Sequence, residues 1–424
     1  MMLPVIASLM FMNNHKEEKL TKNEATSYLS IYLEEEQINY IPKKDSGYTL
    51  DLSKSSCNNG VTISWDNKNW NATLDFTNYQ SGNINRTKCA LYFKKTIESE
   101  IIASLDVTGA CPSVNEGGTL NIDTIENKNS LLCSAPDDYG TSYYYRGNVT
   151  NNYVKFAGFY WRIVRINGDG SIRMIYAGDA NVIDALPNKE EVLQNGYNDS
   201  STSYTQIGEC AFNSIDNESD NAYVGYMFGT PNSATYEETH ANINNSTIKT
   251  KIDNWYEENF LGTKYEEQIA DVGFCNDRSI SDEKVSGYSN LAYKKESTLY
   301  NWYKVIVQTL TCKQDNDMFT TKNALNGNKA LTYPVGTLNI GEVILAGGYS
   351  TSNSDYYLYT GYSYWTMSPR SYAKGEAAVR YVNMTGGINM ENYVDIAGVR
   401  PVINLKPGSL TQGQGTKSSP YTVE

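Results

Sequence analysis

Several short runs of the chain alternate apolar and polar positions with a period of two, and two longer stretches show a helical period. Thr21 to Glu36 opens with a Thr-x-x-Glu capping box and repeats apolar residues on one face, which predicts a helix. Ser246 to Phe260 has a capping serine and a clearer apolar stripe, and it predicts the strongest helix of the chain. Four short runs predict strands of a small β-module: Tyr48–Leu52, Val61–Trp65, Ala72–Phe76 and Ala90–Phe93.

A β-hairpin is predicted where two alternating runs, Phe159–Ile166 and Ile172–Tyr176, flank the turn sequence Asn-Gly-Asp-Gly. Tyr364 to Leu405 contains two more short β-like runs, Ala377–Val382 and Tyr393–Ile396, with Gly386-Gly387 between them. The Asn-, Ser- and Gly-rich region from Asn181 to Thr239 predicts long surface loops.

These patterns divide the chain into five parts and predict an α+β protein. We expect an N-terminal apolar segment and helix in residues 1–40, a small all-β module in 41–96, a connector in 97–142, a main domain in 143–406 and a linker-like tail in 407–424.

The seven cysteines contain no Cys-x-x-Cys pair, which disfavours zinc ribbons and thioredoxin-like sites. Pairing sequence neighbours predicts three disulfides, Cys57–Cys89, Cys111–Cys133 and Cys275–Cys312, although sequence alone does not fix the connectivity. Cys210 is then a buried free thiol. Disulfides of this kind predict an oxidising compartment and an extracellular or cell-surface protein.

The net charge and the N-terminal segment indicate whether nucleic acid or a membrane is to be expected as a partner. The formal net charge is −13, and an acidic chain repels phosphate backbones, so we expect no nucleic-acid binding. The apolar run before Asn13 has the length of a signal-peptide core but lacks the basic flank and the cleavage site, and it is too short to span a bilayer as a helix. An atypical export signal, a short membrane anchor and a buried segment all remain open.

Catalytic and metal-binding patterns are sparse. With only His15 and His240, a Ser-His-acid triad and a histidine zinc site are disfavoured. Asp315 and Asp317 could supply oxygen ligands to calcium, but the glycine and terminal glutamate of a calcium loop are missing, and a solvated turn explains them as well. We therefore expect no cofactor, with calcium as the open alternative.

Tyrosine is frequent, with 35 residues, and it combines a flat apolar ring with a polar tip that suits binding surfaces. The predicted ligand-binding cluster joins tyrosines to amides and an arginine near the C-terminus: Tyr356, Tyr357, Tyr362, Tyr364, Arg370, Tyr372, Asn383 and Asn389. Trp365, Arg380 and Arg400 are interpreted as packing residues.

Five segments together resemble a domain of unknown function of surface and secreted proteins from Firmicutes and related gut bacteria: Phe159–Arg165, Asp271–Ser279, Tyr333–Gly336, Tyr364–Pro369 and Gly398–Ile403. That domain is similar to the C-type-lectin-like fold of formylglycine-generating enzymes. The resemblance implies a lectin-like α+β fold over about Tyr143 to Leu405. The enzymes of that fold use a cysteine pair, for which only Cys275 and Cys312 are available here.

The predicted function is non-catalytic binding of a glycan or a protein at the bacterial surface. One alternative is an enzyme of the formylglycine-generating type that uses Cys275 and Cys312. Another is a structural subunit of the cell envelope or of an appendage, and the sequence leaves the oligomeric state open.

Overall fold

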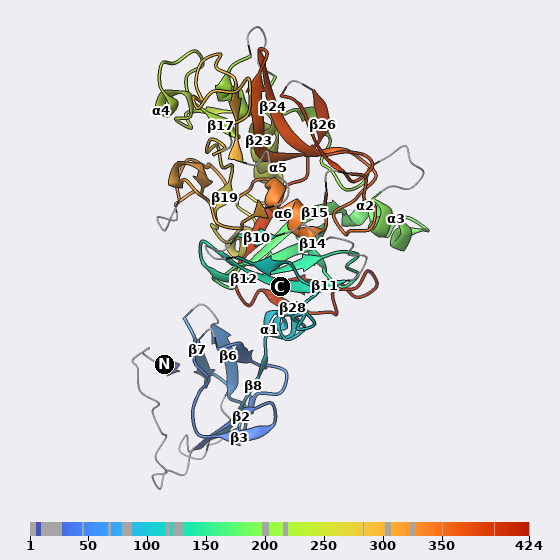
Figure 1. Cartoon of the computed structure of the whole chain (residues 1–424). Coiled ribbons are helices and arrows are strands. Elements are labelled where there is room, and N and C mark those ends of the chain that lie inside the picture. The colour runs from blue at the N-terminus through green and yellow to red at the C-terminus, as the bar shows by residue number, and fades with distance from the viewer. Residues whose placement is uncertain are drawn as a thin grey trace. The chain divides into compact units, whose positions relative to one another are not determined.

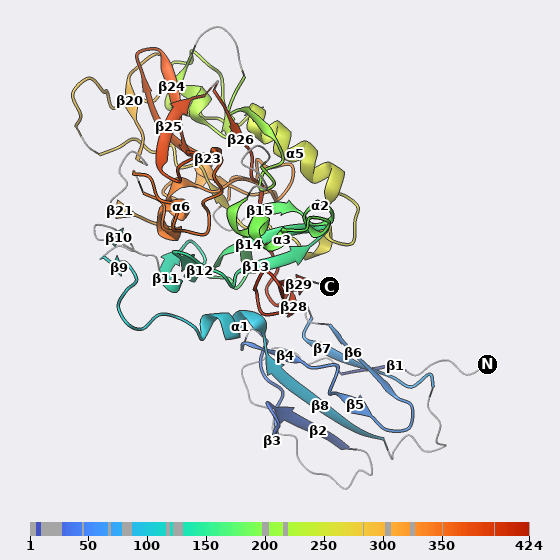
Figure 2. The same cartoon turned by 90° about the vertical axis from the view of Figure 1, so that its right-hand side faces the viewer.

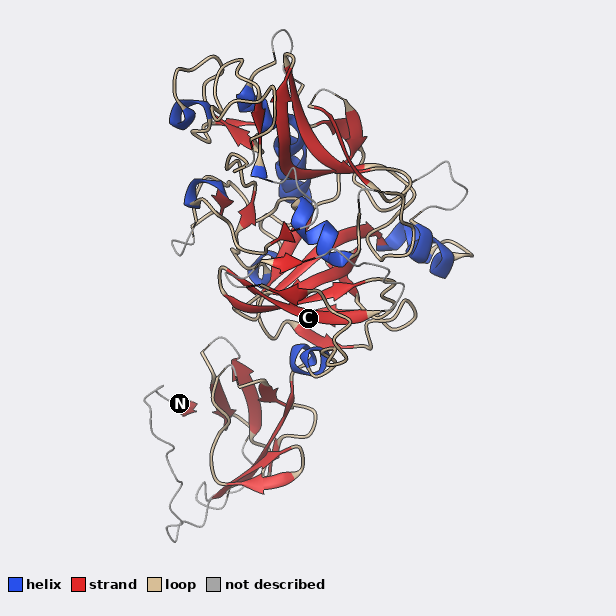
Figure 3. Ribbon diagram, in the orientation of Figure 1, coloured by secondary structure: helices blue, strands red, loops and turns tan. Residues whose placement is uncertain are grey.

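The chain forms two compact units, Met1–Ala103 and Ser104–Glu424, in a computed structural model. The structure describes residues 6–9, 28–44, 46–66, 69–78, 87–115, 119–121, 130–196, 203–214, 219–282, 284–301, 307–322, 327–349, 351–393 and 395–423. Strands outnumber helices in both units, so the protein is α+β with a majority of β-structure (Figure 3).

Two small sheets and one short helix, α1 (Ile97–Ile102), make up the first unit. One sheet has the order β3-β2-β8-β4 with β5 also on β8, and the other has the order β1-β7-β6. Alternate residues of the strands meet in a core that contains Ile31, Leu50, Trp70, Leu91 and Phe93. The strands are β1 (Ile6–Leu9), β2 (Tyr28–Leu33), β3 (Glu36–Ile38), β4 (Tyr48–Leu50), β5 (Ser56–Cys57), β6 (Thr62–Asp66), β7 (Asn71–Asp75) and β8 (Lys88–Lys95).

The predicted helix from Thr21 to Glu36 is wrong wherever the structure describes it. Residues 21–27 lie outside the described residues, and Tyr28–Leu33 forms strand β2, which pairs in parallel with β8. Leu29, Ile31 and Leu33 belong to the core on one side of this strand, so the same residues also satisfy a period of two. The segment fits both the helical period and the strand period, and it forms a strand because it pairs with β8.

The N-terminal apolar run is described only at Ile6–Leu9, which pairs antiparallel with β7. Among the described residues, no helix combines the length and the apolar character that a membrane span needs.

The larger sheet of the second unit has the order β11-β12-β14-β13-β29-β28. In addition, β15 pairs with β14, and β27 pairs with β15. Its strands are β11 (Leu131–Asp137), β12 (Gly140–Arg146), β13 (Tyr153–Phe156), β14 (Phe159–Ile166), β15 (Ile172–Asp179), β27 (Val402–Leu405), β28 (Leu410–Gln412) and β29 (Tyr421–Val423).

The predicted hairpin of β14 and β15 is confirmed. Its turn requires glycine at Gly168, because a Cβ atom there would lie 2.3 Å from the backbone nitrogen of Gly140.

A second sheet in this unit has the order β16-β26-β23-β24-β25, with β20 also on β23, and its long hairpin points away from the larger sheet (Figures 1 and 2). The predicted strand at Ala377–Val382 is confirmed as β24, but the partner across the glycine turn is β25 and not Tyr393–Ile396. The strands are β16 (Glu209–Ala211), β20 (Thr298–Leu299), β23 (Tyr364–Ala373), β24 (Glu376–Val382), β25 (Ile388–Asn392) and β26 (Ile396–Gly398).

The helices of the second unit confirm one prediction and correct another. Helix α5 (Thr247–Asn259) matches the predicted helix, and the Ser246 hydroxyl accepts a hydrogen bond from Lys249 N at its start. The region predicted as surface loops instead contains α2 (Ala180–Asp184), α3 (Lys189–Asn195) and α4 (Tyr236–Thr239). Three short pairings complete the unit: β9 (Ser113–Val114) and β21 (Val307–Gln308) on β10 (Leu120–Asn121), β17 (Met227–Phe228) with β18 (Asn244–Asn245), and β19 (Phe274–Cys275) with β22 (Met318–Phe319).

The C-terminal tail is part of the larger sheet and not a linker. Strand β29 pairs in parallel with β13, and Leu410 and Tyr421 are buried. The Gly- and Ser-rich residues of the tail form the turn between β28 and β29. The apolar residues on either side of this turn belong to strands of the sheet.

The three predicted disulfides are confirmed, and each closes within one unit: Cys57–Cys89 in the first, Cys111–Cys133 and Cys275–Cys312 in the second. Cys210 is the free cysteine, as predicted, and it is partly buried.

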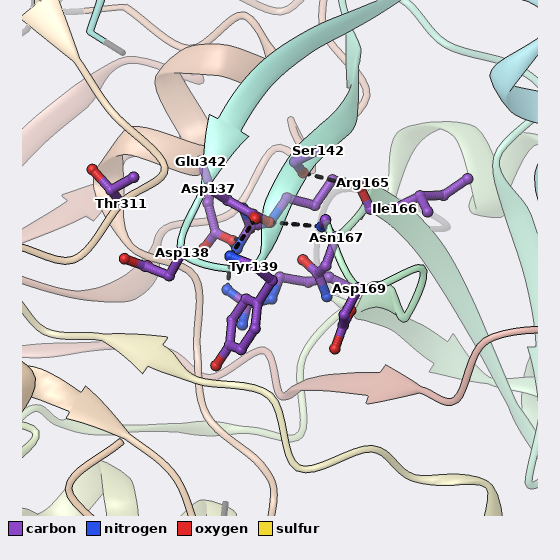
Figure 4. A network of polar contacts seen from close by, with 12 residues as sticks. Asp137, Asp138, Tyr139, Ser142, Arg165, Ile166, Asn167, Asp169, Thr311 and Glu342 are labelled. Atoms are coloured by element: carbon purple, nitrogen blue, oxygen red, sulfur yellow. Dashed lines mark hydrogen bonds and ion pairs between the residues drawn. The ribbon is translucent and has the colours of Figure 1, made fainter. Parts of the chain in front are cut away.

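A buried ion cluster holds helix α6 (Ile340–Ala346) against the larger sheet (Figure 4). Glu342 lies in the first turn of this helix, 2.7 Å from Arg173 and 3.4 Å from Arg165, and all three side chains are buried. Asp137 lies 3.4 Å from the other side of Arg165. Burial by itself would raise the pKa of Glu342, but the two guanidinium groups outweigh it and the pKa is lowered.

We predict that Glu342→Gln destabilises the second unit, because it removes the carboxylate that pairs with the buried guanidinium groups of Arg173 and Arg165. The free energy of unfolding should fall by about 3 kcal/mol, measured by urea denaturation near neutral pH. Since the folded pKa of Glu342 is lowered, its contribution is present above the unfolded value and disappears as the pH falls towards the folded value. The exposed variant Glu258→Gln is the control; an equal loss in both variants would contradict the assignment.

Candidate functional site

Four of the eight predicted ligand-binding residues are buried tyrosines. Tyr356, Tyr357, Tyr364 and Tyr372 are between 1% and 6% exposed. Three of their hydroxyls donate to backbone carbonyls: Tyr356 to Gly386 at 3.0 Å, Tyr364 to Leu358 at 3.1 Å and Tyr372 to Ser219 at 3.1 Å. These four rings fill the core, where three of the hydroxyls find acceptors, so they do not present their flat faces to the solvent.

The other four predicted residues lie nearer to the solvent. Tyr362 and Arg370 are half-buried, and Asn389 is exposed. Asn383 has a structural part in the turn between β24 and β25, since its side-chain oxygen accepts hydrogen bonds from the backbone of Thr385 at 3.0 Å and Gly387 at 2.9 Å. Of the predicted cluster, Arg370 and Asn389 retain side chains that a partner could reach.

Two exposed methionines lie on β25 and in the turn that precedes it. Met384, in the turn that follows β24, is 65% exposed, and Met390, on β25, is 41% exposed. Met390 is the cross-strand partner of Arg380, so their side chains share one face of the sheet. We call Arg370, Met384, Asn389 and Met390 the β24–β25 surface. Sequence patterns missed the methionines, because an apolar residue on a strand is ordinarily a core residue.

Arg370 is positioned by an irregularity of strand β23. Pro369 pairs with Val379 and Ser371 with Ala378, so Arg370 is the extra residue of a β-bulge. A bulge turns a side chain away from the regular alternation of a strand. The Arg370 guanidinium donates to the hydroxyls of Ser371 at 2.8 Å and Tyr288 at 3.3 Å.

The two predicted calcium ligands have different surroundings in the structure. Asp317 is buried, and its carboxylate pairs with the Arg278 guanidinium at 2.5 Å and 2.7 Å. Asp315 is exposed in the same short helical turn. In the part of the chain that the structure describes, no group of three or more acidic, cysteine or histidine side chains is arranged around a common point. The guanidinium of Arg278 takes the place that a cation would need.

His240 lies in the interior of the second unit. Its side chain is buried, and Nε2 lies 3.0 Å from the carbonyl oxygen of Ala292. Burial lowers the pKa of His240 well below its ordinary value, and the charge of Arg278 adds to this effect. The imidazole is therefore neutral at physiological pH.

Asp138, in the turn between β11 and β12, is a partly exposed carboxyl group whose environment alters its pKa (Figure 4). Its two oxygens accept hydrogen bonds from the backbone nitrogen of Cys312 at 2.9 Å and 3.1 Å. Burial raises the pKa of Asp138 to about 6, against the opposing effects of this hydrogen bond and of Arg165. A pKa in this range would suit a general acid or base, but no second titrating group with a complementary role is placed beside it among the described residues.

Residues 222–407 match the family described as Domain of unknown function (DUF6273). The chain thus contains a DUF6273 domain. It includes α5, α6 and the β24–β25 surface, and four of the five segments that carried the resemblance; the segment Phe159–Arg165 precedes it. No curated protein and no solved structure matches the chain, so the lectin-like fold stays a prediction.

We predict that Asp138→Asn stabilises the protein above about pH 7, because it removes a charge that is costly to bury and keeps an acceptor for Cys312 N. The gain should be about 1 kcal/mol, less than the pKa shift alone implies because the carboxyl is partly exposed. The folded pKa lies above the unfolded one, so the folded state binds the proton more tightly and this destabilisation develops as the pH rises from about 4 to about 6.

Thermal unfolding of the wild type and Asp138→Asn at several pH values measures this effect. The two curves should converge towards about pH 4. Asp282→Asn, at an exposed position, serves as the control. A difference between wild type and Asp138→Asn that does not change with pH would contradict the assignment.

Proposed function

We propose that the chain is a non-catalytic binding protein, exported to the bacterial surface or secreted, whose DUF6273 domain contacts its partner through the β24–β25 surface. The observation that carries this proposal is the pair of exposed methionines on β25 and in the turn before it, with the half-buried Arg370 on β23 of the same sheet. Flexible methionine side chains adapt to protein partners, and exposed apolar groups gathered on one element are typical of interaction sites.

A protein is favoured over a glycan as that partner. Sugar recognition uses flat aromatic faces, and the tyrosines Tyr356, Tyr357, Tyr364 and Tyr372 that would supply them are buried. In addition, β25 is the last strand in the order of its sheet, a position at which an extended segment of a partner can pair. The lectin-like fold and an origin in Firmicutes are parts of the same proposal, and the resemblance of the sequence segments is what supports them.

The disulfides support export, because bonds of this kind persist in oxidising compartments. They also weigh against an enzyme of the formylglycine-generating type, since Cys275 and Cys312 are joined to each other and Cys275 is buried. Nothing in the described residues favours the structural-subunit alternative.

A free-thiol count tests the compartment and the enzyme alternative together. Protein unfolded without reductant should carry one thiol, mapped to Cys210 by mass spectrometry. In the folded protein this thiol should react slowly with iodoacetamide, because burial raises its pKa to about 11. Labelling of Cys275 and Cys312 in protein purified from its native compartment would reject export and put the enzyme first.

Binding at the β24–β25 surface is tested by selecting displayed peptides against the purified chain and, in parallel, by probing a glycan array. We expect peptides to be enriched and the double variant Met384→Asp, Met390→Asp to lose their binding. Val182→Asp, which changes another exposed apolar residue, should bind as the wild type does. Binding of glycans only, or peptide binding that the double variant leaves intact, would overturn the proposal.

A further inference from the structure

The outer edge of strand β25 carries backbone groups that the sheet does not use. In the ladder between β24 and β25, Met390 is opposite Arg380. The carbonyl oxygen of Arg380 accepts a hydrogen bond from the Thr366 hydroxyl of β23 at 2.7 Å, so it points away from β25. Opposite residues of an antiparallel ladder direct their backbone groups either towards each other or away from each other. The N–H and C=O of Met390 therefore point away from β24, to the edge of the sheet.

The start of the hairpin gives the same direction. The Asn383 backbone nitrogen donates to the carbonyl oxygen of Gly387 across the turn at 2.8 Å, and the next residue, Ile388, donates its N–H outward to the carbonyl oxygen of Tyr349 at 2.7 Å. Because backbone groups alternate in direction along a strand, Met390 points to the same outer side as Ile388. Tyr349 covers the beginning of this side, and within the described residues no further strand of the sheet pairs with it.

The outward N–H of Met390 is held by a side chain and not by a strand. It donates to Asn389 Oδ1 at 2.9 Å. Asn389 is exposed and Met390 is 41% exposed, so a partner can reach this hydrogen bond. Edge strands with open N–H groups pair readily with other chains, and native proteins protect them. Asn389 Oδ1 occupies the place of a partner's carbonyl oxygen, and rotation of the side chain would vacate that place.

The short length of the open edge decides which partner fits. A second copy of β25, paired about a twofold axis at Met390, would bring Asn392 of that copy opposite Ile388. Tyr349 already occupies that position, because its carbonyl oxygen binds Ile388 N. A short extended segment of another protein needs only the positions around Met390 and avoids Tyr349.

The side chain of Met390 indicates what this segment presents. A residue directly opposite in an added antiparallel strand has its Cβ atom about 5 Å from that of Met390, on the same face of the sheet. The thioether of methionine is flexible and packs on apolar groups of different shapes. An apolar residue at this point of the segment therefore fits the exposed methionine.

We infer that β25 binds a short extended segment of a partner protein as an added strand, in which a carbonyl oxygen of the segment replaces Asn389 Oδ1 on the Met390 N–H. An apolar residue of the segment packs on the Met390 side chain. This inference rests on the proposed function and specifies its ligand, a peptide recognised through its backbone and one apolar residue. Asn389 caps the edge of the unbound protein and turns aside when the segment binds.

Peptides with single N-methylated residues test the added strand without any change to the protein. A peptide from the display selection is methylated at one backbone nitrogen at a time, and its affinity for the purified chain is measured by calorimetry. In an added strand every second N–H points to β25, so methylation at these positions should weaken binding about tenfold, and methylation at the positions between should change it little. Losses without this period of two would overturn the added strand.

Substitutions in β25 test the same contact from the protein side. Met390→Pro removes the outward N–H and leaves the hydrogen bonds to β24 intact, as proline on an edge strand can. It should weaken peptide binding about tenfold, while Met390→Leu, which retains the N–H, should lose no more than about twofold. Asn389→Ala removes the cap that the peptide must displace and should tighten binding about threefold.

The outcomes separate this inference from the proposed function. Equal losses in Met390→Pro and Met390→Leu, or weaker binding by Asn389→Ala, would overturn the added strand while the binding function stands. Thermal unfolding shows whether Met390→Pro is folded; if it is not, the methylated peptides and Asn389→Ala decide. Absence of any peptide binding would overturn both proposals. A dimer of the chain that Met390→Pro dissociates, measured by light scattering, would assign the edge to a second copy and overturn the separate partner.

Discussion

The carboxylate of Glu342 is the constraint on which the second unit depends. It lies in the first turn of α6, where its other oxygen accepts a hydrogen bond from the Asn339 backbone at 3.0 Å and completes a capping box. The same carboxylate pairs with Arg173 and Arg165 of the hairpin β14–β15. A buried ion pair contributes little net stability compared with an apolar core, but it is costly to break, so it fixes one arrangement of helix and sheet.

Helix α6 also contacts the sheet that carries the β24–β25 surface. The backbone nitrogen of Ile340 donates to the Ser368 hydroxyl of β23 at 2.8 Å, and Arg146 of β12 donates to the carbonyl oxygens at the other end of the helix. The two sheets of the unit are therefore joined through one short helix. This helix gives the strands that carry the β24–β25 surface a fixed base.

Much of the fold could be predicted from local patterns. The hairpin β14–β15, helix α5 and the strands β4, β6, β7, β8 and β24 were predicted with small shifts at their ends, and neighbouring cysteines gave the disulfides. These features depend on residues close in the chain, such as a turn sequence, a capping serine or an alternating run. Strand β2 and the C-terminal strands could not be predicted in this way, since each is defined by a partner strand from another part of its unit.

The sequence by itself determined the chemistry available to this protein: two histidines, seven cysteines, a formal net charge of −13 and 35 tyrosines. Only the tertiary structure decided which of these groups reach the solvent. Four tyrosines of the predicted cluster are buried, and their hydroxyls can be buried where a carbonyl oxygen accepts a hydrogen bond. Tyr372, for example, donates to the carbonyl oxygen of Ser219, which is distant in the sequence. Met390 is exposed on β25, the last strand in the order of its sheet. Arg370 is partly exposed at a β-bulge. The exposure of a side chain depends on packing against residues that are distant in the sequence. An alternating sequence pattern indicates only the side of a strand on which a residue lies.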